Sequence, residues 1–364
     1  YKRQLFHLQK QYLLFIGCLF FSMLLVIIGS TLSLGTALSV TSIPLIIYTT
    51  YKIDPRNYLQ RFVKLFFYIA LISIILFTII RLFGFNSFSG IFPHLYTSFY
   101  REGQVYSYGG FLYRFVTLHS DRNCGPFGEP GQYQCVLAVA LYFTLFRPLL
   151  FKEKERMLYM IVFFFALITT LSTSGYISLS ILIFCFLLHS SRTTDKRMKK
   201  IYIAMIIGTV FFMSTTKVGS EFMNTVIFHK IYANGQLDFS LSSGGARTIS
   251  ISSVLSTIYH HPITLVGVGY DELRNMGVGG CAGFLFLLLA IGIMPFSILF
   301  GFCFYQVFKY NKGIWDIIVR ILLVLNMGLG QPHIMNFALF TMMLYPYFIA
   351  NSFKKTNTYY VRDC

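Results

Sequence analysis

The sequence predicts an all-α polytopic integral membrane protein with about ten transmembrane helices. Hydrophobic residues make up 55% of the 364 residues and charged residues only 12%, whereas charged residues approach about a quarter of a soluble domain. The mean hydropathy is +0.65. Apolar runs of about 17–25 residues recur along the chain, and each matches a hydrocarbon core of about 30 Å. These observations exclude a soluble globular protein.

Each apolar run is interpreted as one span, bounded by turn formers and charged residues. The expected spans are residues 12–29, 32–51, 62–82, 132–149, 157–171, 176–189, 201–216, 281–304, 314–329 and 334–350.

Basic residues gather on alternate connectors, as ten spans with both termini on the cytoplasmic side require. On this topology 22 of the 30 Lys and Arg residues lie on the cytoplasmic side and eight on the other side. Most of the formal net charge of +17 is therefore explained by the cytoplasmic placement of Lys and Arg and by their contact with anionic lipid headgroups. Nucleic acid is excluded as a partner.

The domain organisation is a single transmembrane bundle over residues 1–350 and a cytoplasmic tail over 351–364. Two long extracytoplasmic loops, 83–131 and 217–280, interrupt the bundle. The sequence has no phosphate loop, dinucleotide fingerprint or zinc-ligand pair, and its outward loops hold no Asp-x-Asp pair or His cluster for hard oxygen ligation. It therefore indicates no cofactor and no metal. The seven cysteines lack metal spacing, and five of them lie in apolar runs and are interpreted as small apolar side chains: Cys18, Cys135, Cys185, Cys281 and Cys303. Cys124 alone lies in an outward loop, without a clear partner there.

The first loop collects charged residues where a simple connector would need none. Its stretch 114–133 reads RFVTLHSDRNCGPFGEPGQY, with Arg114, Arg122 and Glu129, and Arg101 precedes it. The planar fork of donors on arginine suits phosphate oxygens. The loop is therefore predicted to handle a polar or anionic ligand.

The second loop contains an expected helix. Residues 242–246 are predicted to form a flexible loop, and Arg247 to open an amphipathic helix over 248–259 that lies against the bundle or the membrane interface. The helix is predicted to end at His260-His261-Pro262, because proline is disfavoured inside a helix and restricts the residue before it. Gly267-Val268-Gly269 permits close backbone approach to a ligand or a neighbouring helix.

Four motifs follow one another through these segments. They are Gly125-Pro126-Phe127-Gly128-Glu129-Pro130-Gly131, Ser172-Thr173-Ser174-Gly175, Gly244-Gly245-Ala246-Arg247, and His261-Pro262-Ile263 followed by Gly267-Val268-Gly269. In this order, over roughly residues 110–300, the chain resembles the O-antigen ligase and Wzy-type polymerase family of bacterial envelope glycosyltransferases. It departs from the family at Gly175, which Tyr176 follows, so the arginine usual in that motif has no counterpart.

The resemblance implies a metal-independent, GT-C-like glycosyltransferase in the bacterial plasma (inner) membrane, with its active site facing the periplasm or the exterior. Its donor and acceptor are undecaprenyl-diphosphate-linked glycans, and its further partners are membrane lipids and a regulator of chain length. The candidates to contact the diphosphate are Arg122, Arg247, Arg114 and Arg101. The candidates for general base are His261, His260 and Glu129.

Structural alternatives stay open for these residues. Arg122 pairs with Asp121 or Glu129 in one alternative, and Glu129 holds its turn by accepting backbone hydrogen bonds in another. His261 alternatively caps a helix C-terminus, where a cation is favourable.

Three functions are weighed. The first is a polymerase that joins lipid-linked repeat units into O-antigen or capsular polysaccharide, and the aromatic-rich loops favour it. The second is an O-antigen ligase that moves finished polymer onto lipid A core. The third is a flippase or transporter, which would place charges inside its spans. Here the only mid-span charge is Arg320, with Asp316 one turn earlier as its expected partner.

Overall fold

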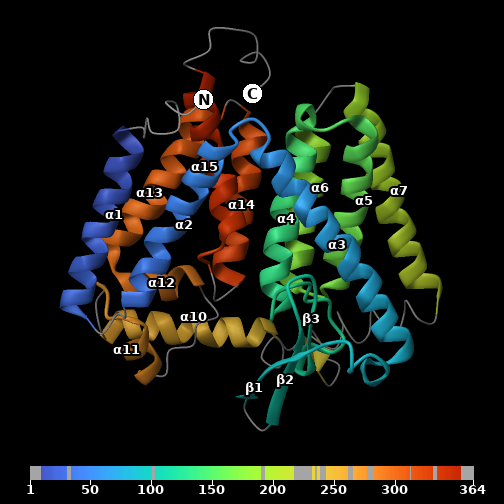
Figure 1. Cartoon of the computed structure of the whole chain (residues 1–364), viewed down its shortest axis with the longest axis horizontal. Coiled ribbons are helices and arrows are strands. Elements are labelled where there is room, and N and C mark those ends of the chain that lie inside the picture. Colours follow the sequence, from blue (N-terminus) through green and yellow to red (C-terminus); the bar gives the residue numbers. More distant parts are fainter. Residues whose placement is uncertain are drawn as a thin grey trace. The chain divides into compact units, whose positions relative to one another are not determined.

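The computed structural model describes residues 10–30, 34–100, 103–189, 193–216, 232–233, 236–237, 243–260, 265–276, 283–311, 313–330 and 334–353 (Figure 1). The expected site residues Arg101 and His261 lie outside these ranges. The chain divides into two compact units. Unit 1 comprises residues 1–55 and 195–364, and unit 2 comprises residues 56–194.

Unit 1 is built from helices at both ends of the chain. Its helices are α1 (Lys10–Gly29), α2 (Leu34–Ile53), α10 (Ser243–His260), α11 (Tyr270–Asn275), α12 (Gly283–Ile291), α13 (Ile293–Tyr310), α14 (Ile314–Gly330) and α15 (Phe337–Phe353). Two short strands, β4 (Tyr232–Ala233) and β5 (Gln236–Leu237), pair antiparallel. Helix α7 (Thr193–Thr215) begins at the boundary between the units. Aromatic packing joins the N-terminal and C-terminal helices, since the rings of Tyr12 and Tyr48 stack at 4.4 Å and those of Tyr51 and Phe348 at 4.7 Å.

Unit 2 is a bundle around one central helix. Its helices are α3 (Tyr58–Phe83), α4 (Pro130–Phe146), α5 (Glu153–Thr169) and α6 (Thr173–His189), with short 3-10 turns at Phe85–Ser87, Thr117–His119 and Pro148–Leu150. Helix α4 packs against α3, α5 and α6 (Figure 1). All its residues except Gln132 are buried, as expected for a helix that is apolar on every side.

A three-stranded antiparallel sheet fills the connection between α3 and α4. Its strands are β1 (His94–Tyr100), β2 (Gly103–Gly109) and β3 (Arg114–Val116), in that spatial order. Exposure alternates along β2, where Val105, Ser107 and Gly109 are buried, because successive side chains of a strand point to opposite faces. The all-α prediction did not include this sheet.

The structure confirms a mostly helical membrane protein. Among the described residues, α1, α2, α3 and α13 are long and apolar enough to cross a membrane, and α6 and residues Phe337–Phe348 are apolar but shorter. Each of the ten expected spans overlaps a helix, and the number of spans stays a prediction.

One expected span, residues 281–304, is broken. Helix α12 ends at Ile291, Gly292 adopts a φ of 83°, and α13 begins at the next residue. The segment 265–269 fills the break, because Val268 N donates to Leu289 O and Gly269 N to Ala290 O, both at 3.0 Å, and Met294 N donates to Leu265 O at 3.2 Å. A Cβ on Gly267 would lie 2.3 Å from Ala290 O. The predicted close approach at Gly267 is thus confirmed for a neighbouring helix.

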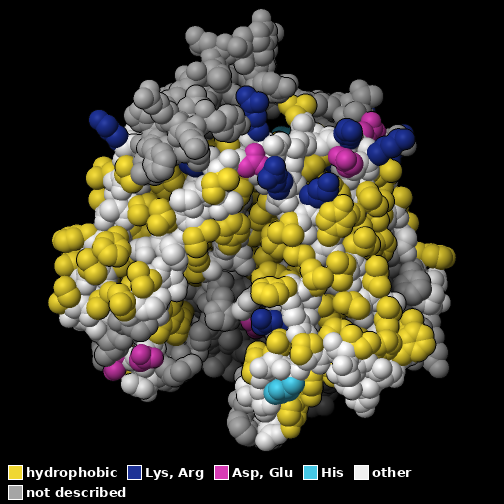
Figure 2. All heavy atoms as spheres, viewed as in Figure 1, with side chains coloured by type: hydrophobic (Ala, Val, Ile, Leu, Met, Phe, Trp, Pro, Cys, Tyr) yellow, Lys and Arg dark blue, Asp and Glu magenta, His cyan; other side chains and the backbone are white. Residues whose placement is uncertain are grey.

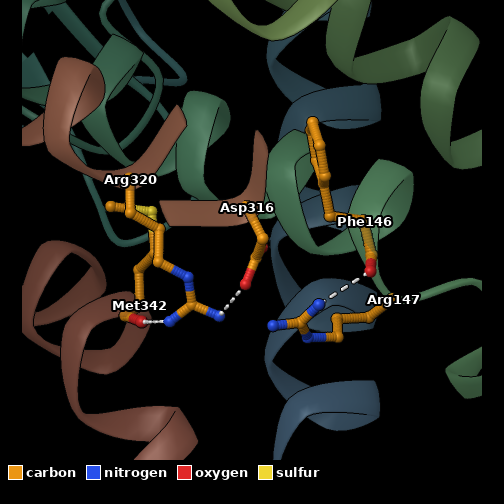
Figure 3. Close-up of polar contacts among 5 residues, drawn as sticks. All are labelled: Phe146, Arg147, Asp316, Arg320 and Met342. Carbon is orange, nitrogen blue, oxygen red and sulfur yellow. Dashed lines mark hydrogen bonds and ion pairs between the residues drawn. The ribbon is translucent and has the colours of Figure 1, made fainter. Parts of the chain in front are cut away.

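Two further sequence predictions concern polar residues of unit 1. Helix α10 ends at His260, as predicted, but it begins at Ser243, so the flexible loop predicted for residues 242–246 is wrong from Ser243 onward. The predicted pair on α14 is confirmed, since Arg320 Nη2 lies 3.3 Å from Asp316 Oδ2 and Nη1 donates to Met342 O (Figure 3). Both residues are buried, and this neutralises the charge inside the bundle.

Candidate functional site

Four segments of unit 2 meet at one end of its bundle. They are the sheet, the loop over residues 120–129, the N-terminus of α4 and the corner between α5 and α6 (Figure 1). Arg114, Arg122 and Glu129, three of the residues singled out from the sequence, lie on these segments. Hydrogen bonds and close packing hold each of these segments in place.

Asn123 fixes the loop to the bundle. Its side chain is fully buried, and its Nδ2 donates to Ser73 Oγ of α3 at 3.2 Å and to Thr169 Oγ1 of α5 at 3.0 Å. Its Oδ1 accepts from Gly125 N at 3.0 Å, and its own N–H donates to Thr169 O at 3.0 Å. With its donors and acceptor paired, Asn123 anchors the loop at several points. The sequence analysis did not select Asn123, because a single amide side chain shortly before Gly125-Pro126 forms no recognisable motif.

Arg122 binds the end of α5. Its Nε donates to Thr170 O at 3.2 Å and its Nη2 to Leu171 O at 3.0 Å. The last carbonyls of a helix lack intrahelical partners, and a cation there is favourable. Burial lowers the pKa of Arg122, while the nearby Asp121 and Glu129 carboxylates act in the opposite direction. The guanidinium is partly buried and has more N–H donors than these two bonds use.

The same contact recurs at the other end of α4. Arg156 is buried, and its Nε and Nη2 donate to Thr144 O and Leu145 O, each at 2.8 Å. Arg147 Nη1 donates to Phe146 O at 2.9 Å (Figure 3). Arginines therefore satisfy helix-end carbonyls at both ends of unit 2, and Arg122 has a structural role whatever else it binds.

The corner between α5 and α6 carries backbone strain. Leu171 has a φ of 48°, and it is the one non-glycine residue with positive φ in the part of the chain that the structure describes. A branched side chain in this region is unusual and energetically unfavourable. The Arg122 bond to its carbonyl helps to hold the corner in this conformation.

Helices α4 and α6 start side by side at this corner. Gln134 of α4 is buried, its Nε2 donates to Ser174 Oγ at 3.3 Å, and its Oε1 accepts from Ser178 Oγ at 3.4 Å. A Cβ on Gly175 would lie 3.2 Å from Gln134 Cβ, so the small residue lets the two helices approach closely. The positive ends of two helix dipoles therefore face the same end of the unit.

Gly125 makes the turn that leads into α4. Its φ is 52°, and a Cβ there would lie 2.7 Å from the ring of Tyr133. Tyr133 is fully buried, and its hydroxyl lies 2.7 Å from Ser73 Oγ. The ring cannot retreat without breaking that bond, so only glycine fits at residue 125.

Arg114 and Ser107 share the inner face of the sheet. The register pairs Gly109 with Arg114 and Ser107 with Val116, which places Ser107 diagonally beside Arg114. Ser107 is fully buried, and both its Oγ and the buried Nε of Arg114 have no hydrogen-bond partner among the described residues. Buried donors are nearly always paired. Both atoms lie beneath the surface of the protein, so they are unsatisfied donors inside the sheet and are not by themselves a ligand site.

Glu129 precedes the first residue of α4. Its backbone is extended, with φ −144° and ψ 130°, and its side chain makes no capping hydrogen bond. The interpretation of Glu129 as a holder of the turn through its carboxylate is therefore not supported. A carboxylate at this position is favoured by the helix dipole, and it remains open to a substrate.

His119 is a partly buried histidine in this loop. Burial lowers its pKa to about 4, the Arg122 charge adds to this effect, and the Asp121 carboxylate opposes it. The imidazole is therefore neutral at neutral pH and resists protonation, which makes it a weak candidate for the general base. Cys124, by contrast, is a buried free thiol whose pKa burial raises to about 12, so it is unreactive.

The other expected site residues belong to unit 1 or lie outside the described residues. Arg247 and His260 lie on α10 of unit 1, and Arg101 and His261 lie outside the described residues. Within the described ranges, no group of three or more His, Cys, Asp or Glu side chains is placed to hold a metal ion.

Together, two arginines and two helix N-termini make this end of unit 2 suited to an anionic oxygen ligand. Glu129 is the candidate general base among these residues. Comparison with family models, curated proteins and solved structures finds no match for the chain.

Proposed function

We propose that this membrane protein is a polymerase, which joins undecaprenyl-diphosphate-linked repeat units into O-antigen or capsular polysaccharide. The observation that carries the proposal is the double contact of Arg122 with the α5–α6 corner, because it holds a cation beside the N-termini of α4 and α6. A fixed cation and two helix dipoles suit a leaving group that develops negative charge.

The reaction forms one bond to the anomeric carbon of the donor and breaks another. The oxygen of an acceptor sugar hydroxyl attacks the anomeric carbon of the donor, and the bond between that carbon and the diphosphate oxygen breaks. The lipid diphosphate leaves with the bonding electrons, and the hydroxyl proton passes to a general base. Arg122 and Arg114 are proposed to bind the diphosphate oxygens, and Arg247 and Arg101 stay sequence predictions for the same role.

The base is proposed to be one of the groups that are neutral or anionic near pH 7. Glu129 lies in the same loop as Arg122, and its carboxylate acts to raise the pKa of that arginine. His260 and His261 remain candidates from the sequence. Histidine and carboxylate bases differ in their pH profiles, which separates the two kinds of group by experiment.

The location follows from the same proposal. Ten spans with both termini in the cytoplasm would place the connection that holds β1–β3 outside the plasma membrane, where lipid-linked repeat units are joined. A regulator of chain length would be a further partner, and a metal ion or cofactor is not required, because the diphosphate linkage is already activated.

A transporter is the second candidate, and the break at Gly292 is the observation that favours it. Transporters use broken helices to expose helix ends to a substrate. In this chain the backbone of residues 265–269 occupies the break, since it forms hydrogen bonds with both α12 and α13. Pro295 has no N–H and Met294 donates to Leu265, so little of the positive end of α13 is left for a ligand. An O-antigen ligase shares the donor and chemistry of the polymerase and differs in its acceptor.

Deletion of the gene in its host, followed by gel analysis of surface polysaccharide, tests the proposal. A single repeat unit on the core indicates a lost polymerase. Polymer that accumulates on the lipid carrier indicates a lost ligase, and repeat units that accumulate on the cytoplasmic face indicate a lost flippase. Complementation with wild-type protein restores the normal ladder, whereas Arg122→Ala is expected not to. A normal ladder in the deletion strain would contradict the proposal.

A further inference from the structure

The turn between β2 and β3 exposes two large apolar side chains. This turn, which we call the sheet tip, consists of Gly110, Phe111 and Leu112. Phe111 is 98% exposed and Leu112 is 50% exposed. A fully exposed phenylalanine beside an exposed leucine marks a surface that contacts something apolar.

The next residue fixes the depth of the sheet tip along the bundle. Tyr113 is 3% exposed and belongs to a cluster with Ile80 of α3 and Phe115 of β3, against which Leu76 and Phe77 of α3 also pack. Ile80 precedes the last residue of α3 by three positions, which corresponds to about 4.5 Å along the helix axis. The sheet tip therefore lies beside the last turns of α3.

Helix α3 is one of the helices long and apolar enough to cross a membrane. Exposed apolar residues run to its end: Leu71, Ile75 and Leu82, on the side away from Ile80, are 37%, 50% and 72% exposed, and Phe83, on the side of Ile80, is 66% exposed. In a spanning helix such residues contact lipid. Figure 2 shows hydrophobic side chains over this side of the bundle, down to the level of the sheet.

The sheet tip has no charged residue between Gly109 and Tyr113, and it lies at the membrane level of the end of α3, on the side of the helix that carries Ile80 and Phe83. Phenylalanine and leucine at the end of a span lie where apolar side chains enter the boundary between headgroups and acyl chains. We infer that the sheet tip inserts into the lipid bilayer beside the Phe83 end of α3, and so anchors the sheet to the membrane surface.

The insertion has a consequence for Arg114. This residue follows Phe111 by three positions, at the start of β3, so an inserted tip holds Arg114 close to the level of the headgroups. The diphosphate of a lipid carrier lies at that level. This consequence rests on the proposed function, whereas the insertion itself does not.

Depth-dependent fluorescence quenching tests the inference. The chain has a single tryptophan, Trp315, so Trp315→Phe gives a background without tryptophan. Into it we would place Phe111→Trp in one protein and, as a control, Gln104→Trp in another. Gln104 is exposed near the far end of β2, about 20 Å along the strand from the sheet tip. Both full-length proteins are reconstituted in phosphatidylcholine vesicles whose acyl chains carry bromine near the headgroup or near mid-chain.

The expected result is blue-shifted emission from the tryptophan at residue 111 and quenching several times stronger than at residue 104, greatest with the shallow bromine. If Phe111→Trp does not yield folded protein, Leu112→Trp is measured in its place. Unquenched emission at the sheet tip would overturn the inference. Equal quenching at both positions would overturn it too, because the whole sheet would then lie on the membrane.

An activity measurement separates this inference from the proposed function. Phe111→Ser is expected to raise the KM for a lipid-linked donor and to leave kcat close to that of the wild type, because it alters the depth of the sheet and not the reacting groups. If the tryptophan at residue 111 is quenched but the protein has no polymerase activity, the membrane insertion stands and the proposed function is refuted. If the protein is an active polymerase but the tryptophan is not quenched, the proposed function stands and the insertion is refuted.

Discussion

The Nη2 atom of Arg122 donates a hydrogen bond to the carbonyl oxygen of Leu171 at 3.0 Å, at a residue whose φ is 48°. The bond joins the loop before α4 to the corner after α5. A positively charged side chain therefore stabilises an unfavourable backbone conformation and is fixed by it in return. Arg122 is thus both a structural residue and a candidate ligand contact. Substitutions whose effects on stability and on activity are measured separately can distinguish the two roles.

Substitution of Arg122 by lysine is expected to lower the free energy of unfolding by about 1–3 kcal/mol, because an ammonium cannot bond both carbonyls as the guanidinium does. If Arg122 also binds diphosphate, polymer formation is lost even at temperatures where the protein is folded. The matched control is Arg156→Lys, which removes the same kind of double carbonyl contact at the other end of α4. Thermal unfolding in detergent and polymer ladders measure the two effects. Equal activity in the two variants would leave Arg122 with its structural role alone.

Gly125→Ala is expected to destabilise the protein by about 2–4 kcal/mol, through the positive φ and the contact of the new Cβ with the Tyr133 ring. The control is Gly128→Ala, whose Cβ would meet only the Tyr96 hydroxyl, at 3.5 Å. Denaturant unfolding of both variants checks the prediction. A double variant with Tyr133→Ala should lose less stability than the two single losses added together, and simple additivity would show that the ring is not the obstacle.

Ser107→Ala is expected to leave the free energy of unfolding unchanged or to raise it by about 1 kcal/mol, because it removes a buried hydroxyl that has no partner. The contrasting variant is Ser73→Ala, since Ser73 Oγ donates to Ala70 O at 2.9 Å and accepts from Asn123. That change should lower stability. A destabilised Ser107→Ala protein would show that the hydroxyl is paired in the absence of substrate.

The His119 imidazole should make stability depend on pH in the acidic range. Its pKa is lowered from 6.5 to about 4, so folding favours the neutral form. The contribution is complete above the unfolded pKa and is lost as the pH falls from about 6.5 towards about 4. Thermal unfolding of wild type and His119→Gln at about pH 7 and about pH 5 checks this, and the variant should lose less stability on acidification. His94→Gln, at an exposed histidine of β1, is the control and should behave as the wild type.

The helices were predictable because the length and apolarity of a span are local properties of the sequence. Helix α3 was expected over 62–82 and runs over Tyr58–Phe83. The sheet was missed, although Gly103–Gly109 places Val105, Tyr106 and Tyr108 between two glycines and such residues are enriched in strands, because a long loop was given no structure of its own. The break in the span 281–304 depends on one glycine and on a segment more than twenty residues earlier in the chain. Such a contact has no local signal.

The candidate site was predictable as a segment but not as a set of contacts. The charges of residues 114–133 stood out because charge is scarce in this chain. The partners of Arg122 are backbone carbonyls nearly fifty residues away, and backbone carbonyls occur at every position. For the same reason the sequence suggested Asp121 or Glu129 as its partner and did not indicate the α5–α6 corner.

The contact between residues 265–269 and the break at Gly292 bears on the order of assembly during synthesis. The segment that supplies the backbone bonds precedes the broken helix in the chain, so it leaves the ribosome first. Unpaired backbone groups are costly in hydrocarbon, and here their partner already exists when the two half-helices arrive. A circular permutation that moved residues 265–269 behind α13 would leave the half-helices to enter the bilayer unpaired. The chain order of Gly267 and Gly292 therefore sets which of the two partners is synthesised first.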